Sequence, residues 1–232
     1  MRPRSRSMLV LALLLAIPVA GASAQEPMGQ QADVVENFPT MAGGGEDLLL
    51  AENAHLERSP DGITISIRIP TPEPGSYTYP ETVPLERQAQ PEVFTGWAFV
   101  FNNPEHCVTN PEPPRCGPGD FNEEVKVGVY TFGGHVASLD QHSGGDLVAN
   151  EATDGDVVLA GSVMAGQEQL PMPPDAVTFP LENPEGAEVH AAIAPHGQLD
   201  VSLLPGDLYN PVGDPACECW RVAIFLPPSD RA

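Results

Sequence analysis

The clearest pattern of apolar and polar positions in this chain lies at residues 62–69, where isoleucine alternates with polar residues. Successive side chains of a strand point to opposite faces of a sheet, so this spacing predicts a half-buried strand whose isoleucines face the core. The turn sequence Ser59-Pro60-Asp61-Gly62 precedes the strand and predicts a hairpin with residues 48–57. The predicted core face consists of Ile63, Ile65, Ile67 and Ile69, and the predicted outer face of Thr64, Ser66 and Arg68.

A second strand is predicted at residues 93–101, and it is apolar on both faces. Trp97, Phe99 and Phe101 alternate with Ala98 and Val100. A strand that is apolar on both sides is covered on both sides, so we expect it at the centre of a sheet. The asparagines that follow it, Asn102 and Asn103, are expected to fix the next loop through side-chain hydrogen bonds.

The rest of the chain repeats short apolar runs between turn residues. Further strands are predicted at 125–132, 156–164, 187–194 and 219–226, and one short helix within 198–208. The 27 prolines and 22 glycines leave no room for long amphipathic helices. The predicted fold is therefore all-β with little helix, either an antiparallel β-sandwich or a partly open Greek-key barrel.

The first 24 residues have the pattern of a signal peptide. Arg2, Arg4 and Arg6 precede an apolar run from residue 8 to residue 20, and Ala22-Ser23-Ala24 supplies a small-residue cleavage site before Gln25. We therefore expect an exported protein, periplasmic or extracellular, with no transmembrane segment in the mature chain and, since no cysteine follows the site, no lipid anchor. Residues 25–46 are polar and are expected to form a flexible linker, followed by a single β domain at 47–232.

The charge of the chain excludes some classes of partner. The formal net charge is −22, and Lys126 is the single lysine. Removal of the leader leaves 10 − 3 = 7 basic residues against 32 acidic ones, a net charge of −25. Such a surface does not attract nucleic acid or anionic lipid, and it suits a saline habitat.

Four cysteines remain in the mature chain, and export makes disulfide bonds the expected state. Cys107 and Cys116 enclose a short loop that contains three prolines, and we expect them to pair with each other. Cys217 and Cys219 would lie on one face of a strand, so a bond between them requires a kinked backbone. Their pairing is left open, and a metal-binding pair is the alternative.

Histidines supply the other candidate site. Glu188 and His190 share one face of the predicted strand 187–194, and His196 lies just past its end. His135 follows another strand after Gly133 and Gly134. If the two strand ends are neighbours, these four side chains could hold zinc or copper. The alternative is that each histidine bonds to backbone carbonyls and only supports its loop.

Several motifs resemble a family of uncharacterised secreted prokaryotic proteins. They are FNNPEHC at 101–107, Cys116-Gly117, Gly134-His135, LENPEGAEVH at 181–190 and His196-Gly197, followed by a cysteine-bearing final strand. The resemblance covers roughly residues 55–226 and implies export but no assigned activity. The family has a wider spacing of its last two cysteines than Cys217-Glu218-Cys219. A vaguer likeness, at the level of fold, is to CHRD domains and the copper-zinc superoxide dismutase sandwich.

These features together predict an exported, disulfide-stapled all-β domain that acts as a non-catalytic binding or structural protein. The chain has no P-loop, no G-x-G-x-x-G, no G-x-S-x-G and no H-E-x-x-H sequence. The alternative function is that of a zinc- or copper-binding protein, including an enzyme, with its site at His135, His190 and His196 and with Glu188 beside them.

Overall fold

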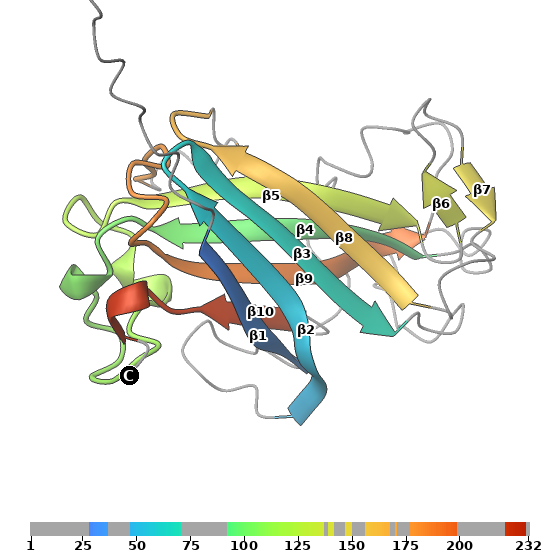
Figure 1. The fold of residues 1–232 in the computed structure, drawn as a ribbon, viewed down its shortest axis with the longest axis horizontal. Coiled ribbons are helices and arrows are strands. Elements are labelled where there is room, and N and C mark those ends of the chain that lie inside the picture. Colours follow the sequence, from blue (N-terminus) through green and yellow to red (C-terminus); the bar gives the residue numbers. More distant parts are fainter. Residues whose placement is uncertain are drawn as a thin grey trace, which may run out of the picture.

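Strands make up most of the computed structural model (Figure 1). The structure describes residues 28–36, 47–70, 92–136, 139–141, 147–149, 156–167, 170, 177–198 and 221–230. Within these ranges the chain forms β-strands and short 3-10 helices and no α-helix. No helix in this part of the chain is long and apolar enough to cross a membrane.

The strands form two four-stranded antiparallel layers that face each other as a β-sandwich. One layer contains β1 (Met28–Glu36), β2 (Asp47–Ser59), β3 (Gly62–Pro70) and β8 (Asp156–Met164). The other contains β5 (Val127–Val136), β4 (Glu92–Phe101), β9 (Glu188–Gln198) and β10 (Arg221–Phe225). The short strands β6 (Leu139–Gln141) and β7 (Leu147–Ala149) extend the second layer beyond β5.

The two layers are joined at one edge by hydrogen bonds and meet closely at the opposite edge. At the first edge β1 pairs with β2 along most of its length and with β10 at Val35 and Glu36. The β1–β2 pairing has register shifts near Val34, and such irregularities bend a strand so that it can pass from one layer to the next. At the opposite edge the backbones of β5 and β8 touch, because a Cβ on Gly161 would lie 1.6 Å from the Phe132 carbonyl oxygen.

The main core lies between the layers. The β3 isoleucines at 63, 65, 67 and 69 are at most 2% exposed, whereas Thr64 and Arg68 are exposed and Ser66 is half-buried. Opposite them lie Ala98, Val100, Val189, Ala191 and Ile193 of the other layer. A second apolar cluster lies on the far side of β4, where Trp97, Phe99 and Phe101 are also buried. Both faces of β4 are therefore covered, and β5 and β9 pair with its two edges.

The sandwich confirms the predicted fold class, and the strands agree with the sequence pattern. The hairpin of β2 and β3 turns through Pro60 and Asp61, with Ser59 paired to Gly62. Gly62 has φ of +156°, and a Cβ there would lie 2.4 Å from the Val163 carbonyl oxygen, so the position requires glycine. Of the predicted short helix at 198–208, only Gln198 lies within the described residues, and it belongs to β9.

The predicted linker at 25–46 is wrong for residues 28–36, which form β1 between β10 and β2. The sequence concealed this strand because its four polar residues, Gln30, Gln31, Asp33 and Glu36, do not alternate regularly with its apolar ones. Among the β1 side chains that the structure describes, Val34 is fully buried in the core and Ala32 packs against the core with partial burial. Exposed polar side chains such as Gln31 and Asp33 alternate with these apolar ones.

Candidate functional site

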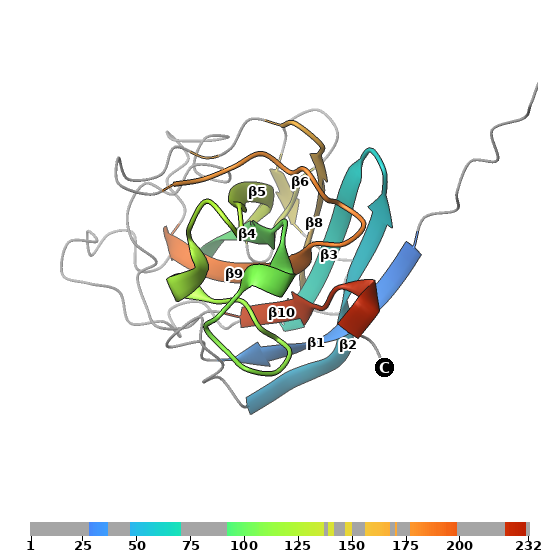
Figure 2. The ribbon, with the colours of Figure 1, turned by 90° about the vertical axis from the view of Figure 1, so that its left-hand side faces the viewer.

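The loop between β4 and β5, residues 102–126, lies at one end of the sandwich, as Figure 2 shows. It contains two 3-10 turns, η2 (Pro104–His106) and η3 (Pro118–Asp120). Cys107, Cys116 and Val125 of this loop belong to the apolar cluster on the outer face of β4. The loop therefore covers Trp97, Phe99 and Phe101, which explains why aromatic side chains alternate with the core residues of β4.

The predicted disulfide between Cys107 and Cys116 is confirmed. The Cα atoms of the two cysteines are 5.0 Å apart, and Cys116 is fully buried. Inside the closed ring, the Asn110 N–H donates to the Arg115 carbonyl at 3.0 Å, and the Asn110 side chain donates to the Pro114 carbonyl at 2.9 Å. The ring thus has a fixed internal conformation. Cys217 and Cys219 lie outside the described residues, so their pairing stays open.

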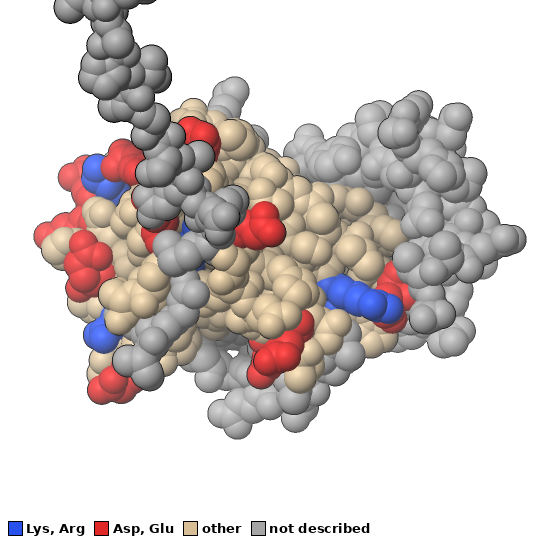
Figure 3. All heavy atoms as spheres, viewed as in Figure 1, with Lys and Arg blue, Asp and Glu red and all other residues tan. Residues whose placement is uncertain are grey.

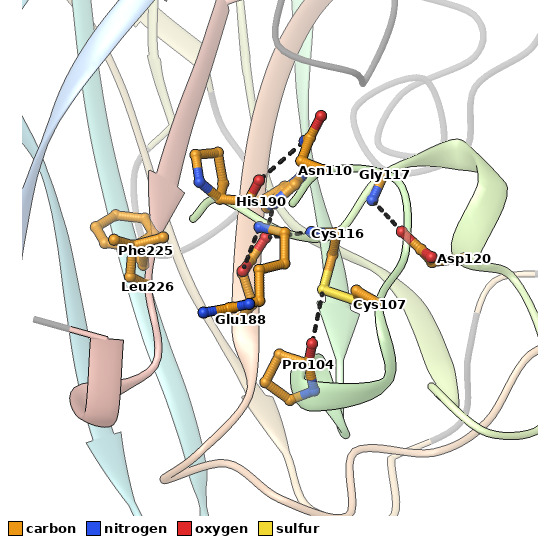
Figure 4. A network of polar contacts seen from close by, with 12 residues as sticks. Pro104, Cys107, Asn110, Cys116, Gly117, Asp120, Glu188, His190, Phe225 and Leu226 are labelled. Carbon is orange, nitrogen blue, oxygen red and sulfur yellow. Dashed lines mark hydrogen bonds and ion pairs between the residues drawn. A yellow bond between two sulfur atoms is a disulfide. The ribbon is translucent and has the colours of Figure 1, made fainter. Parts of the chain in front are cut away.

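A buried carboxylate joins the disulfide ring to β9 (Figure 4). Glu188 is 0% exposed, and one of its oxygens, Oε1, accepts the Cys116 N–H at 3.1 Å. Its other oxygen, Oε2, accepts the Arg115 N–H at 3.2 Å. Unpaired backbone N–H groups are costly to bury, so this carboxylate compensates two donors that no neighbouring strand reaches.

His190 is the third donor to Glu188. Its Nε2 lies 2.7 Å from Glu188 Oε1, and its side chain is 2% exposed. Since the carboxylate already accepts two backbone N–H groups, this contact assigns the ring proton to Nε2. The Nδ1 atom is buried and finds no hydrogen-bond partner in the described part of the chain. The Phe101 ring packs beside the imidazole, with centroids 4.9 Å apart.

Asp120 is a second buried carboxylate that holds the same loop, and it is not among the site residues predicted from the sequence. It is 0% exposed, and its two oxygens accept the N–H groups of Val108 and Gly117, each at 2.8 Å. Gly117 precedes η3, so Asp120 caps this turn from within it. Its sequence signal is an aspartate three residues after a glycine, in a turn that contains Pro-Gly. Such a pattern is common in loops, so it does not single out Asp120 as a site residue.

Asn102 and Asn103 fix loops, as predicted, although the partners are distant in sequence. The Asn102 side chain donates to the carbonyls of Lys126 at 2.6 Å and Pro180 at 3.0 Å. Its Oδ1 accepts the N–H groups of Glu182 and Asn183 at 2.7 and 3.0 Å. Every polar position of this fully buried amide is therefore used. Two of the four Asn-Pro pairs in the sequence, at 103–104 and 183–184, lie at this junction.

Tyr130 lies on β5 beside the same junction. Its hydroxyl donates to the Phe179 carbonyl at 3.4 Å, and its ring belongs to the main core. Burial raises the pKa of Tyr130 to about 12, and the negative charge of Glu182 acts in the same direction, while a hydrogen bond with the Leu181 backbone opposes both. The neutral phenol is therefore the stable form here up to strongly alkaline pH.

The structure places the four predicted metal ligands at two separate positions along β4. Glu188 and His190 lie near one end of this strand, and His135 and His196 near the other. Phe99 of β4 pairs with His190 of β9, whereas Phe94 of β4 pairs with His135 of β5. The two histidines are thus five residues apart along β4, roughly 17 Å. The two histidines also lie on opposite faces of the sheet, because residues paired across strands share a face. Phe99, the partner of His190, belongs to the outer cluster, whereas Phe94, the partner of His135, belongs to the main core.

Glu188 and His190 meet as expected, but His135 does not join them. The physical reason is that β5 and β9 flank β4, and the two histidines occupy opposite ends of that arrangement. His196 lies within β9 at the register shift beside Phe94, at the His135 end and not past the strand end. Nothing is described of its side chain. Among the described residues, no three His, Cys, Asp or Glu side chains gather in a metal-binding arrangement.

Acidic side chains gather on the surface at the end that carries the disulfide ring (Figure 3). The exposed ones in this region are Glu105, Glu112, Glu123, Glu124 and Glu182. Lys126 pairs with Glu182 at 2.7 Å. Val108 projects from the ring and is 80% exposed. This end therefore presents an apolar side chain among carboxylates on a rigid support.

Comparisons with protein-family models, with curated proteins and with solved structures gave no match.

Proposed function

We propose that this chain is an exported, non-catalytic binding or structural domain that presents the loop at 102–126 on a β-sandwich. The observation that carries the proposal is that buried polar groups hold the backbone of this loop in place and join it to β9 and to the segment before β9. Asn102, Asp120 and Glu188 are all fully buried, and each makes at least two hydrogen bonds to backbone groups of the loop or its neighbours. A loop held in one conformation binds a partner without an ordering cost.

Export is supported by two independent features. The leader at residues 1–24 has the charged, apolar and small-residue regions of a signal peptide. A disulfide that is buried in the folded domain is typical of proteins that fold in an oxidising compartment. The resemblance to secreted prokaryotic proteins at FNNPEHC and LENPEGAEVH agrees with this proposal.

The surface of the disulfide ring is the proposed binding surface. Val108, Pro111 and Glu112 are exposed there, while the backbone beneath them is held by Asp120 and Glu188. The acidic surroundings favour partners with a positive surface and repel nucleic acid and anionic membranes. The proposal assigns no catalytic group, and the buried polar groups of the loop serve to hold it.

The experiment is expression of the full chain in a bacterium with an oxidising periplasm, followed by fractionation and a non-reduced peptide map. We expect a product outside the cytoplasm that begins at Gln25 and contains a Cys107–Cys116 cross-link. The variant Ala24→Tyr is the matched control, because a bulky side chain at the cleavage site blocks leader removal. A product that keeps residues 1–24 and stays in the cytoplasm would contradict the proposal.

A further inference from the structure

We propose that Cys107 is the residue that an external disulfide oxidant modifies first, and that Cys116 then displaces the oxidant and closes the ring. In this scheme Asp120 and Glu188 are positioning residues, because they hold the two cysteines close together before any bond joins them. The inference goes beyond the proposed function, because it assigns a modification site and describes how the ring closes. It does not depend on export.

A single buried side chain, Asp120, binds the backbone directly after each cysteine (Figure 4). Its first oxygen, Oδ1, accepts the N–H group of Val108, the residue after Cys107, at 2.8 Å. Its second oxygen, Oδ2, accepts the N–H group of Gly117, the residue after Cys116, also at 2.8 Å. Hydrogen bonds to a carboxylate that is shielded from water are strong. This side chain therefore keeps the two cysteines near each other through their backbones.

Two further acceptors fix the cysteines themselves. Glu188 accepts the Cys116 N–H at 3.1 Å, and the Pro104 carbonyl accepts the Cys107 N–H at 3.1 Å. The same Pro104 oxygen lies 4.0 Å from the Cys116 sulfur, so it can accept the thiol proton in the reduced chain. None of these hydrogen bonds requires the sulfur–sulfur bond. We therefore expect the reduced chain to keep them and to hold the two thiols side by side.

The two cysteines differ in their access to solvent. Cys107 is 9% exposed, and it lies between two exposed residues, His106 and Val108. Cys116 is 0% exposed, and the glycine that follows it is buried. Thiol–disulfide exchange requires direct contact between a thiolate and a sulfur atom of the oxidant, so its rate depends on access. The oxidant therefore meets Cys107 first, and Cys116 reacts within the protein.

The chemistry balances with a small disulfide, such as glutathione disulfide, as the oxidant. The Cys107 thiolate attacks one sulfur of the oxidant, which forms a mixed disulfide and releases the first glutathione thiolate. The Cys116 thiolate then attacks the Cys107 sulfur, which forms the ring bond and releases the second glutathione thiolate. Two electrons pass to the oxidant, and the two glutathione thiolates take up the protons that the cysteines lose.

The roles of the two cysteines are tested with single-thiol variants of the full chain. Cys217→Ser and Cys219→Ser are combined with either Cys116→Ser or Cys107→Ser, and each protein is treated with glutathione disulfide and followed by intact mass. In native buffer, Cys107 should form the mixed disulfide at least about ten times faster than Cys116. In urea the two rates should be similar, because unfolding exposes both sulfur atoms.

The positioning role is tested in the chain that keeps both loop cysteines. The equilibrium constant for ring closure, measured in glutathione buffers, should be at least about 30-fold larger in the folded chain than in urea, where closure costs conformational entropy. Asp120→Asn and Glu188→Gln should each lower the constant of the folded chain at least about tenfold. Glu105→Gln is the matched control, because Glu105 is an exposed carboxylate of the same loop, and it should leave the constant unchanged.

Circular dichroism at each point establishes that both redox forms are folded. A residue that only supported global stability would then leave the ring-closure constant unchanged, so this constant distinguishes the two roles. Should Asp120→Asn fail to fold when reduced, the same comparison with Glu188→Gln decides.

Three results would overturn the proposal. The first is modification of Cys116 as fast as that of Cys107 in native buffer. The second is a ring-closure constant that the carboxylate variants leave unchanged. The third is unfolding of the reduced two-cysteine chain, because its thiols would then not be held together before oxidation. These measurements use purified protein and leave the expected outcome of the export experiment unchanged, so the two proposals fail independently.

Discussion

Asn102 and Asn183 bind each other through both backbone and side chain. Asn183 donates its backbone N–H to Asn102 Oδ1 at 3.0 Å, and its side-chain amide donates to the Asn102 backbone carbonyl at 3.0 Å. Asn102 directly follows β4 and Asn183 lies before β9, so these two hydrogen bonds join the start of the disulfide loop to the segment that leads into the strand carrying Glu188 and His190.

Replacement of Asn102 should be strongly destabilising. Asn102→Ala removes a fully buried amide that makes four hydrogen bonds, so the N–H groups of Glu182 and Asn183 lose their acceptor and the carbonyls of Lys126 and Pro180 each lose a donor. We expect a loss of about 3 kcal/mol in the free energy of unfolding, measured by urea denaturation. The side chain of the neighbouring Asn103 makes an exposed hydrogen bond to the Glu124 carbonyl, so Asn103→Ala should cost about 1 kcal/mol or less. Equal losses for the two variants would contradict the assignment.

The disulfide should contribute measurably to stability. Cross-linking residues nine apart reduces the conformational entropy of the unfolded chain, which the loop-entropy model values at about 2–3 kcal/mol. The double variant Cys107→Ser/Cys116→Ser should lower the denaturation midpoint accordingly, with an unchanged far-ultraviolet circular dichroism spectrum. A midpoint equal to that of the unaltered chain would show that hydrogen bonds to Asp120 and Glu188 suffice to hold the ring.

Stability should fall in alkali because of Tyr130. The tyrosine of the unfolded chain loses its proton near pH 10, whereas burial raises the pKa in the folded protein to about 12. Between these values the unfolded chain binds fewer protons, so the free energy of unfolding decreases as pH rises, by up to about 3 kcal/mol. Denaturation series at pH 9 to 12 measure this slope, and Tyr130→Phe should make it shallower. An equal slope in the two proteins would show that titrating groups other than Tyr130 cause the loss of stability.

The backbones of β5 and β8 lie so close together that a side chain at position 161 should not fit between them. A Cβ there would lie 1.6 Å from the Phe132 carbonyl oxygen, so Gly161→Ala must separate the two strands. We expect a loss of more than about 2 kcal/mol in the free energy of unfolding. Ala160→Ser is the matched control, because Ala160 is exposed on the same strand, and it should change stability by less than about 0.5 kcal/mol. A stable Gly161→Ala protein would show that the layers are farther apart at this edge.

The strands of the sandwich could be predicted because their periodicity is strong. The isoleucines of β3 and the two apolar faces of β4 follow directly from strand geometry. β1 escaped prediction because its apolar residues do not alternate regularly with its polar ones, so MGQQADVVE is not a recognisable strand pattern. Its place is decided by partners on β2 and β10, which are distant in sequence.

The candidate site could be predicted only in part. Alternation placed Glu188 and His190 together and opposite Val189 and Ala191, and the structure confirms that side-chain pattern. Alternation within one strand does not tell where another strand ends, so the position of His135 depended on strand order. Asp120 has only a weak sequence signal, because its two partners, Val108 and Gly117, are backbone groups of a loop without periodicity.

The most direct test of the fixed loop is amide hydrogen exchange measured residue by residue in the oxidised full chain. The Cys116 and Val108 N–H groups, which donate to Glu188 and Asp120, should exchange as slowly as the amides of β4, that is, only through global unfolding. Glu188→Gln should accelerate exchange at Cys116 at least tenfold relative to β4, while the exposed control Glu105→Gln should not. Fast exchange at Cys116 and Val108 in the unaltered chain, with β4 still protected, would contradict a loop held rigidly on the sandwich.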